Sequence, residues 1–218
     1  GKSTLLSVMS RNNRPLEGQA RLENRDLVEY KPKEFAKKFA IVYQQNDIPQ
    51  DLTVEKLVMF GRMPYSSLLK KKTEEDEEAV TWALSCTNLL DKRENDLSAL
   101  SGGERQRVWI AMALAQKSEI LCLDEPTTYL DIYYQLELLE LVKALNDKHH
   151  LTIVMVLHDI NQAIRYSDHV ILMKNGQIVA EGLPREVITK EVIKDVYGVN
   201  AVFHEDEQLG LYMMPLSI

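Results

Sequence analysis

The sequence lacks the long apolar runs and the cysteine pairs that mark several large classes of protein. No apolar run approaches the roughly 18 residues of a membrane-spanning helix, and residues 1–218 contain no signal-peptide pattern, although a segment before residue 1 could carry one. The only two cysteines, Cys86 and Cys122, fit neither a disulfide framework nor a metal-binding spacing. Any role at a membrane would therefore be peripheral, and both thiols are predicted to be ordinary side chains.

Positive charge is also scarce. The 218 residues include 26 Lys and Arg against 33 Asp and Glu, a net charge of −7 at pH 7. Binding to nucleic acid through a basic face needs clustered Lys and Arg, so the composition argues against a nucleic-acid partner. With 45% apolar and 27% charged residues, the chain can bury one good core and a small second lobe.

Short β-type runs alternate with amphipathic helical stretches, which is typical of an α/β domain with a mainly parallel central sheet. Strands are predicted at 39–43, 120–123 and 151–157, and the last two are nearly unbroken apolar runs, as in strands covered on both faces. Helices are predicted directly after Thr4 and over five further stretches: about 54–60, 74–86, 102–116, 132–147 and 160–166.

Three further features concern the second half of the chain. Apolar residues recur at helical spacing within 132–147 and are predicted to face the core: Leu136, Leu139, Val142 and Leu145. Asn175-Gly176 predicts a β-hairpin over 170–181, because this pair tolerates the positive φ of a type I′ turn. Residues 183–218 are expected to form a C-terminal appendix of helices and a short strand.

The first four residues, Gly1-Lys2-Ser3-Thr4, are the second half of the phosphate-binding pattern G-x-x-x-x-G-K-[ST]. In that loop backbone amides surround phosphates, the lysine contacts the β- and γ-phosphates and the hydroxyl binds Mg²⁺. A helix beginning directly afterwards would direct its positive dipole end at the anion. A capped helix start is the alternative. Because the strand that feeds such a loop is central to its sheet, we expect the natural chain to begin earlier.

A second motif is the apolar strand Ile120-Leu-Cys-Leu that ends in Asp124 and Glu125. Ligands of doubly wound sheets bind beyond the carboxyl ends of the strands. At such a place Asp124 could hold Mg²⁺, and Glu125 could orient and activate a water molecule. The alternative is a polar turn that closes the strand.

A third motif is "LSGGERQR", which begins at Leu100. Ser101 and Glu104 match the S-x-x-E capping box that opens a helix. Gly102 and Gly103 reduce helix stability at this place, which is explained if a phosphate approaches their backbone amides closely. The chain therefore has two helix N-termini that suit anions.

Together with Thr127-Thr-Tyr-Leu-Asp131 and Leu157-His-Asp159, these motifs follow the order of the ATP-binding cassette family, the nucleotide-binding subunits of ABC transporters. The resemblance covers residues 1–159. It implies a P-loop NTPase fold of the ABC ATPase type, in one domain over 1–218 with a helical subdomain at about 50–115 and antiparallel β elements. It also implies a homodimer that encloses two ATP molecules, with each LSGGE facing the phosphates bound by the other copy.

The resemblance implies a role for each matching residue of the nucleotide site. Lys2 would contact the β- and γ-phosphates, Ser3 would bind Mg²⁺, and Gly1 and Thr4 would add phosphate contacts. Ser101, Gly102 and Gly103 would contact the nucleotide of the partner copy.

Three more residues are implied to sense the nucleotide or the partner. Gln44 resembles the Q-loop glutamine that senses Mg²⁺ and the γ-phosphate, although the neighbouring Gln45 leaves an ambiguity of one residue. Asp131 resembles the D-loop aspartate that crosses the dimer interface. His158 resembles the switch histidine that touches the γ-phosphate.

Three stretches resemble importers of iron–siderophore complexes: 52–65, 108–115 and 124–131. Haem and cobalamin importers share much of this pattern. The resemblance implies transmembrane permease subunits as partners, which would meet residues 45–72, and a substrate-binding protein as an indirect partner. The protein would then lie at the cytoplasmic face of the cell membrane.

Two other classes of function remain open. Soluble ABC ATPases that handle DNA insert long coiled coils between the Q-loop and the signature motif, whereas only 56 residues separate Gln44 from Ser101. A regulatory module that binds ATP without turnover is the second alternative. The presence of Glu125 and His158 argues against it.

Overall fold

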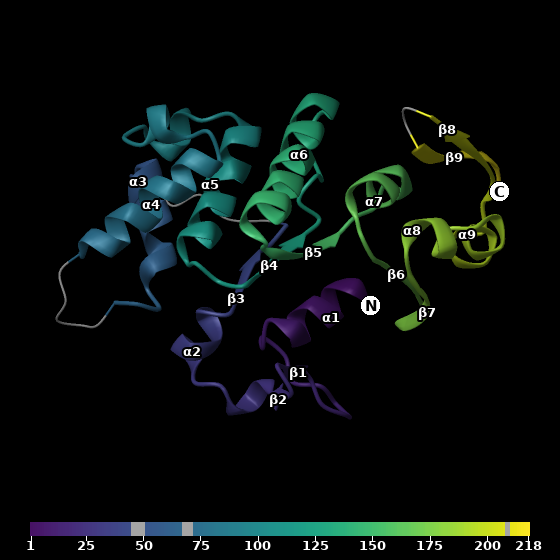
Figure 1. Cartoon of the computed structure of the whole chain (residues 1–218), viewed down its shortest axis with the longest axis horizontal. Helices are drawn as coiled ribbons and strands as arrows, with labels where there is room; N and C mark the ends of the chain where they lie inside the picture. Colours follow the sequence, from purple (N-terminus) through teal and green to yellow (C-terminus); the bar gives the residue numbers. More distant parts are fainter. Residues whose placement is uncertain (45–50, 67–71, 208–209) are drawn as a thin grey trace. The chain divides into compact units, whose positions relative to one another are not determined.

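The computed structural model describes residues 1–44, 51–66, 72–207 and 210–218 (Figure 1). It divides the chain into two compact units, one of Gly1–Leu5 with Leu157–Ile218 and one of Leu6–Val156. In this described part of the chain, no helix combines the length and the apolar character needed to cross a membrane. The single domain over 1–218, its helical subdomain and the appendix at 183–218 stay predictions.

The larger unit holds most of the helices and the parallel sheet. After α1 (Lys2–Met9), its helices are α2 (Pro32–Ala36), α3 (Val54–Met59), α4 (Glu74–Cys86), α5 (Gly102–Ala115) and α6 (Ile132–His149). Its strands are β1 (Arg21–Leu22), β2 (Arg25–Asp26), β3 (Phe39–Val42), β4 (Ile120–Asp124) and β5 (Thr152–Val156). Short 3-10 helices lie at Leu27–Glu29, Phe60–Arg62, Leu90–Lys92 and Leu97–Ala99.

The central sheet of this unit has the order β3-β4-β5, and both pairings are parallel. Side chains of β4 alternate between two separate cores: Leu121 and Leu123 lie in one, and Cys122 lies in the other. Figure 1 shows α5 and α6 on one side of β3 and β4, and α2 on the other. The predicted α/β fold with a mainly parallel sheet is therefore confirmed.

Burial explains the chemistry of the two free thiols. Cys122 is fully buried in the sheet, and this burial raises the pKa of its thiol to about 12. Cys86 is half-buried at the end of α4, and burial raises the pKa of its thiol as well. Both groups stay protonated at neutral pH, so neither is an activated nucleophile.

The helices between β3 and β4 pack around a buried arginine. The Arg62 guanidinium donates to the Asp76 carboxylate at 2.8 Å and to the carbonyl oxygen of Ala115 at 3.0 Å. It also lies 3.8 Å from the centre of the Tyr65 ring. The Asp76 carboxylate compensates the charge of the buried guanidinium. Because Asp76 belongs to α4 and Ala115 ends α5, the Arg62 side chain links these two helices.

The smaller unit contains α7 (Ile160–Tyr166), β6 (Val170–Lys174), β7 (Gln177–Gly182), α8 (Pro184–Val187), α9 (Lys190–Tyr197), β8 (Asn200–Asp206) and β9 (Gly210–Ser217). The predicted hairpin is confirmed: β6 pairs with β7 across Asn175 and Gly176, whose φ angles are 50° and 83°. The single short strand expected near the C-terminus is wrong. β8 and β9 form an antiparallel pair instead, because Ala201 and Met213 pack with Ile193 in one hydrophobic core.

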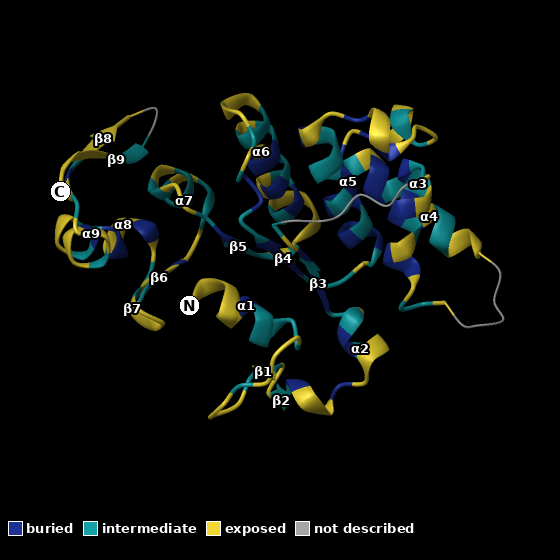
Figure 2. Ribbon diagram, turned by 180° about the vertical axis from the view of Figure 1, so that it is seen from behind, coloured by how far each residue is buried: buried dark blue, intermediate teal, exposed yellow. Residues whose placement is uncertain are grey.

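The predicted apolar stripe of α6 is wrong at one position. Leu139, Val142 and Leu145 are buried, but Leu136 is 43% exposed and Leu138 takes a place in the core. Each residue advances a helix by about 100°, so three steps of three residues accumulate a drift of about 180°. Leu136 therefore lies opposite Leu145. Figure 2 shows α6 with buried and exposed faces.

This correction can be tested by two matched substitutions in α6. Leu139→Ala should lower the free energy of unfolding by about 2 to 5 kcal/mol, because it leaves a cavity in the core. Leu136→Ala should change it by less than about 0.5 kcal/mol. Urea denaturation followed by circular dichroism measures both. Equal losses for the two variants would contradict the buried face described above.

Candidate functional site

The predicted phosphate-binding residues form the start of α1. The helix begins at Lys2, before the predicted start after Thr4, and the amide of Leu5 donates to the carbonyl oxygen of Gly1 at 3.0 Å. The amides of Lys2, Ser3 and Thr4 therefore lie in the first turn, where they have no carbonyl acceptor within the helix. These residues are exposed. This arrangement suits an anion at the helix N-terminus.

The predicted carboxylates lie at the carboxyl end of β4. Asp124 is the last residue of the strand and is half-buried. Glu125 follows with a φ of 50°, in the left-handed region that side chains other than glycine rarely occupy. Such backbone strain is often kept at functional sites, where it directs a side chain that an ordinary turn would place elsewhere.

Gln44 contacts the Glu125 carboxylate directly. Its Nε2 donates to Glu125 Oε2 at 2.7 Å, and the Thr128 hydroxyl donates to the same oxygen at 3.4 Å. Since a carboxylate oxygen accepts, the amide nitrogen of Gln44 faces Glu125 and its Oε1 is directed elsewhere. The contact follows from the sheet, because Gln44 comes two residues after β3 and β3 pairs with β4. Thr128 is a site residue that the sequence analysis missed.

The predicted capping box at the start of α5 is confirmed. The hydroxyl of Ser101 accepts from the amide of Glu104 at 3.3 Å, and the Glu104 carboxylate accepts from the amide of Ser101 at 2.8 Å. Lys92 forms an ion pair with the same carboxylate, a partner that the sequence analysis missed. The Lys92 ammonium and then the Ser101 amide lower the pKa of Glu104 to about 2. These contacts close the first turn of α5.

The two glycines of this turn have different surroundings. A Cβ on Gly103 would lie 2.6 Å from Cδ1 of Tyr134, so the packing within the chain requires glycine there. A Cβ on Gly102 would meet nothing within 4 Å among the described atoms. No contact among the described residues therefore explains Gly102, which is exposed.

Asp131 and His158 are both exposed. Asp131 caps α6, because its Oδ1 accepts from the amide of Tyr134 at 3.1 Å. His158 belongs to the smaller unit and precedes Asp159, which caps α7 by accepting from the amide of Gln162 at 3.0 Å. Asp131 therefore has a structural role within the chain whatever its role toward a partner.

The predicted residues are distributed over both units. Gln44, Asp124, Glu125, Ser101, Gly102, Gly103 and Asp131 belong to the larger unit, whereas Gly1, Lys2, Ser3, Thr4 and His158 belong to the smaller one. Within the larger unit, the structure brings Gln44 and Glu125 into contact. Gln45, the other candidate for the Q-loop position, lies outside the described residues.

The predicted magnesium ligands suit that ion by their donor chemistry. Mg²⁺ takes oxygen ligands, and Ser3, Asp124 and Gln44 supply a hydroxyl, a carboxylate and an amide oxygen. The nitrogen of the Gln44 amide is occupied by Glu125, so the oxygen is the atom left for a metal. Each of these side chains therefore offers an oxygen of the kind that Mg²⁺ binds.

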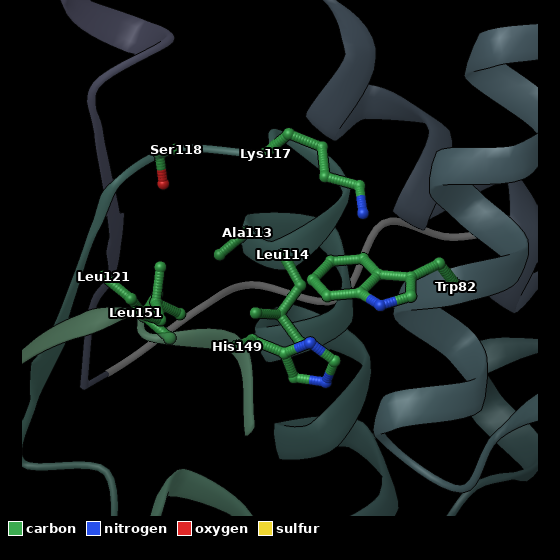
Figure 3. Close-up of a pocket in the computed structure, with 8 residues that line it drawn as sticks. All are labelled: Trp82, Ala113, Leu114, Lys117, Ser118, Leu121, His149 and Leu151. Atoms are coloured by element: carbon green, nitrogen blue, oxygen red, sulfur yellow. The ribbon is translucent and has the colours of Figure 1, made fainter. Parts of the chain in front are cut away.

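A cavity of about 260 Å³ lies elsewhere, at the amino ends of β4 and β5 (Figure 3). Its walls include Trp82 of α4, His149 of α6 and Lys117, whose ammonium lies 3.1 Å from the centre of the Trp82 ring. Asp124 and Glu125 come from the opposite end of β4. This cavity is therefore separate from these two carboxylates.

The family model described as "ABC transporter" matches residues 1–128, which include the phosphate-binding half-loop, the signature turn and Glu125. The chain belongs to the ABC transporter family. It is thus a nucleotide-binding subunit of the ABC type, and the enzyme class predicted from the sequence, an ABC ATPase, is confirmed.

Curated ABC relatives are similar over nearly the whole chain. The probable siderophore transport system ATP-binding protein YusV of Bacillus subtilis is 48% identical over 96% of this chain and 76% of its own length. The ferric enterobactin transport ATP-binding protein FepC of Escherichia coli is 44% identical over 96% of this chain and 77% of its own length.

Solved ABC structures are similar as well. A structure of a metal-chelate type ABC transporter in an inward-facing conformation has a TM-score of 0.86, with 26% identity over 99% of this chain and 83% of that chain. The ATP-binding cassette MJ0796, solved as a dimer after hydrolysis with ADP and Pi, has a TM-score of 0.70. It is 31% identical over 85% of this chain and 81% of its own. The ABC ATPase fold is confirmed.

The capping box at the signature turn predicts a defined dependence of stability on pH. The pKa of Glu104 in the folded protein is about 2, below its ordinary 4.5. Its stabilising effect is therefore complete above about pH 4.5 and is lost as the pH falls toward 2. Glu104→Gln should lower the free energy of unfolding at pH 7 by about 1 kcal/mol and flatten its decline over this acidic range.

Urea denaturation at a series of pH values measures the effect. Glu94→Gln is the matched control, because Glu94 is exposed and belongs to no described hydrogen bond or ion pair. The same pH profile for the wild-type protein and Glu104→Gln would contradict the assigned pKa.

Proposed function

We propose that this chain is the ATP-binding and ATP-hydrolysing subunit of an ABC importer that energises the uptake of ferric siderophores. The names of the relatives support this cargo, since YusV and FepC are described as siderophore and ferric enterobactin transport proteins. The iron(3+)-hydroxamate import ATP-binding protein FhuC of Bacillus subtilis, 45% identical over 92% of this chain, supports it too.

The observation that carries hydrolysis is the environment of Glu125. Its carboxylate stands at the carboxyl end of a buried strand and accepts hydrogen bonds from Gln44 and Thr128. In the proposed reaction Glu125 orients a water molecule and accepts its proton as the water oxygen attacks the γ-phosphorus. The bond to the β–γ bridging oxygen breaks, and the products are ADP and phosphate.

The remaining site residues hold the triphosphate. Lys2 contacts the β- and γ-phosphates, and Gly1 and Thr4 add contacts from the start of α1. Ser3, Gln44 and Asp124 would hold Mg²⁺, which would neutralise charge on the phosphates. His158 contacts the γ-phosphate and distinguishes ATP from ADP.

Two copies of the chain complete each site in this proposal. Lys2 of one copy and the turn of Ser101, Gly102 and Gly103 of the other grip one γ-phosphate, and Asp131 crosses the interface. The open space around Gly102 supports a ligand approaching from outside the chain. Exposed apolar side chains flank Asp131 and support a contact with the second copy there: Tyr129, Ile132 and Tyr133. ATP thus closes the dimer and hydrolysis releases it.

The motion would be passed to transmembrane permease subunits at the cytoplasmic face of the cell membrane. The predicted contact surface is 45–72, of which 51–66 and Lys72 are described. Phe60 and Met63 are exposed apolar residues in that segment, which supports a protein contact there. A substrate-binding protein would act on the permease and only indirectly on this chain.

Haem and cobalamin are the alternative cargoes, and a soluble ABC ATPase is the alternative class. In a strain from which the gene is deleted, the complete protein should restore uptake of labelled ferric siderophore but not of labelled haem or cobalamin. Restored uptake of another cargo would replace the siderophore. Failure to restore any uptake, with ATP hydrolysis intact, would favour the soluble class.

Glu125→Gln should preserve ATP binding and abolish turnover, because the amide keeps the size of the side chain but cannot accept the proton. ATP should then hold the dimer closed. Phosphate release measures turnover, and size-exclusion chromatography with ATP and Mg²⁺ measures the dimer. Turnover at the wild-type rate would refute Glu125 as the base.

Mixing two inactive variants tests whether each site uses both copies. Ser101→Ala and Lys2→Ala should each impair hydrolysis, because every homodimer site lacks one group. In a mixed dimer one site receives Lys2 and Ser101 from different copies and is complete, whereas the other lacks both. Each mixed dimer should therefore hydrolyse ATP at up to about half of the wild-type rate, because one of its two sites is complete. No recovery would argue against sites shared between copies.

A further inference from the structure

The start of α5 is shaped by a side chain of α6. Gly103 is buried, although its neighbours Ser101 and Gly102 are exposed. The position of a Cβ on Gly103 is 2.6 Å from Cδ1, 2.9 Å from Cγ and 3.2 Å from Cε1 of Tyr134. The aromatic ring therefore lies directly against the backbone of the signature turn, in space that any other residue at 103 would occupy.

The position of Tyr134 is itself tied to Asp131. Tyr134 is the third residue of α6, and its amide donates to the capping carboxylate of Asp131 at 3.1 Å. The Gln135 side chain donates to the carbonyl oxygen of Leu130 at 2.9 Å and closes the same turn. The ring that rests on Gly103 is thus held by the loop that contains Asp131.

A second contact joins the two helices one turn further along. Arg107 of α5 forms an ion pair with Glu137 of α6, and the Arg107 side chain is only 11% exposed. Gly103 and Arg107 are four residues apart, and Tyr134 and Glu137 are three apart, so both contacts lie on the facing sides of the helices. The N-terminal parts of α5 and α6 are therefore joined by two contacts, one at Gly103 and Tyr134 and one at Arg107 and Glu137.

We propose that Tyr134 is a positioning residue for ATP hydrolysis: its ring joins the Ser101–Gly103 turn to Asp131, so that both elements meet the partner copy in one fixed arrangement. This inference rests on the proposed function, in which the turn and Asp131 face the partner. Glycine supplies no side chain of its own at position 103, and the atoms nearest to that side of the turn belong to the Tyr134 ring. Removing the ring would take away this contact between the turn and α6.

The hydroxyl of Tyr134 has no hydrogen-bond partner within the described residues, which separates the role of the ring from that of the oxygen. Tyr134→Phe should therefore hydrolyse ATP like the wild-type protein. Tyr134→Ala should lower kcat by about 10- to 100-fold, since a displacement near 1 Å of a positioned group costs about that much. Leu136→Ala, an exposed position on the same helix, is the matched control and should leave kcat unchanged.

The measurements use the complete protein assembled with its membrane partners. Binding of a fluorescent ATP analogue to the protein should be equal in the wild type and Tyr134→Ala, because the residues of α1 that bind phosphate are unchanged. A merely structural role would weaken binding, Tm and kcat together. Tyr134→Leu keeps apolar bulk without the flat ring, so it should fold even if the alanine variant does not, and should still lose kcat.

A double-mutant cycle gives the sharpest test. Gly103→Ala in the wild type places a methyl group against the ring, whereas in Tyr134→Ala the space is empty. The fold loss of kcat caused by Gly103→Ala should therefore be at least about tenfold smaller in the Tyr134→Ala background than in the wild-type background. An equal loss in both backgrounds, or wild-type kcat in Tyr134→Ala and Tyr134→Leu, would overturn the inference.

Ser101→Ala separates this inference from the proposed function. If Ser101→Ala hydrolyses ATP at the wild-type rate, the turn does not take part in hydrolysis and the proposed function fails with the inference. If Ser101→Ala is impaired while Tyr134→Ala and Tyr134→Leu are not, only the positioning role of Tyr134 fails.

Discussion

The parallel pairing of β3 with β4 is the constraint on which the described site depends. Parallel strands end at the same edge of a sheet, so the residues that follow β3 and β4 are brought together although they are 81 positions apart. Burial of both faces of β4 holds that register, because a shift of one residue would exchange Leu121 and Leu123 with Cys122 between the two cores. The 2.7 Å contact between Gln44 and Glu125 is the consequence.

Two helix caps of this protein coincide with proposed site residues. Ser101 and Asp131 each satisfy an amide at the start of a helix, and each is also a residue that the family resemblance assigns to the partner or its nucleotide. Capping leaves these side chains at exposed helix ends, with the remaining first-turn amides facing outward. The structural role therefore does not compete with the proposed one, because the cap is what holds the residue in an accessible place.

Much of the fold could be predicted from the chain itself. The strands, the Asn175-Gly176 hairpin and the capping box are local patterns, and each is confirmed. The two errors have different origins. The error at Leu136 is one of helical spacing, because nine residues at about 100° each already place Leu136 opposite Leu145. The pairing of β8 with β9 depended on a core built with α9.

The sequence by itself determined the family and predicted which residues bind the nucleotide, because phosphate-binding loops, helix caps and carboxylates after a strand are short motifs that can be recognised before the fold is known. Only the tertiary structure decided the partners of those motifs: Lys92 beside Glu104, Gln44 beside Glu125 and Tyr134 against Gly103. The reason is physical. Contacts between residues far apart in the sequence form when helices and strands pack in three dimensions. The type of one residue does not specify which distant residue it will contact.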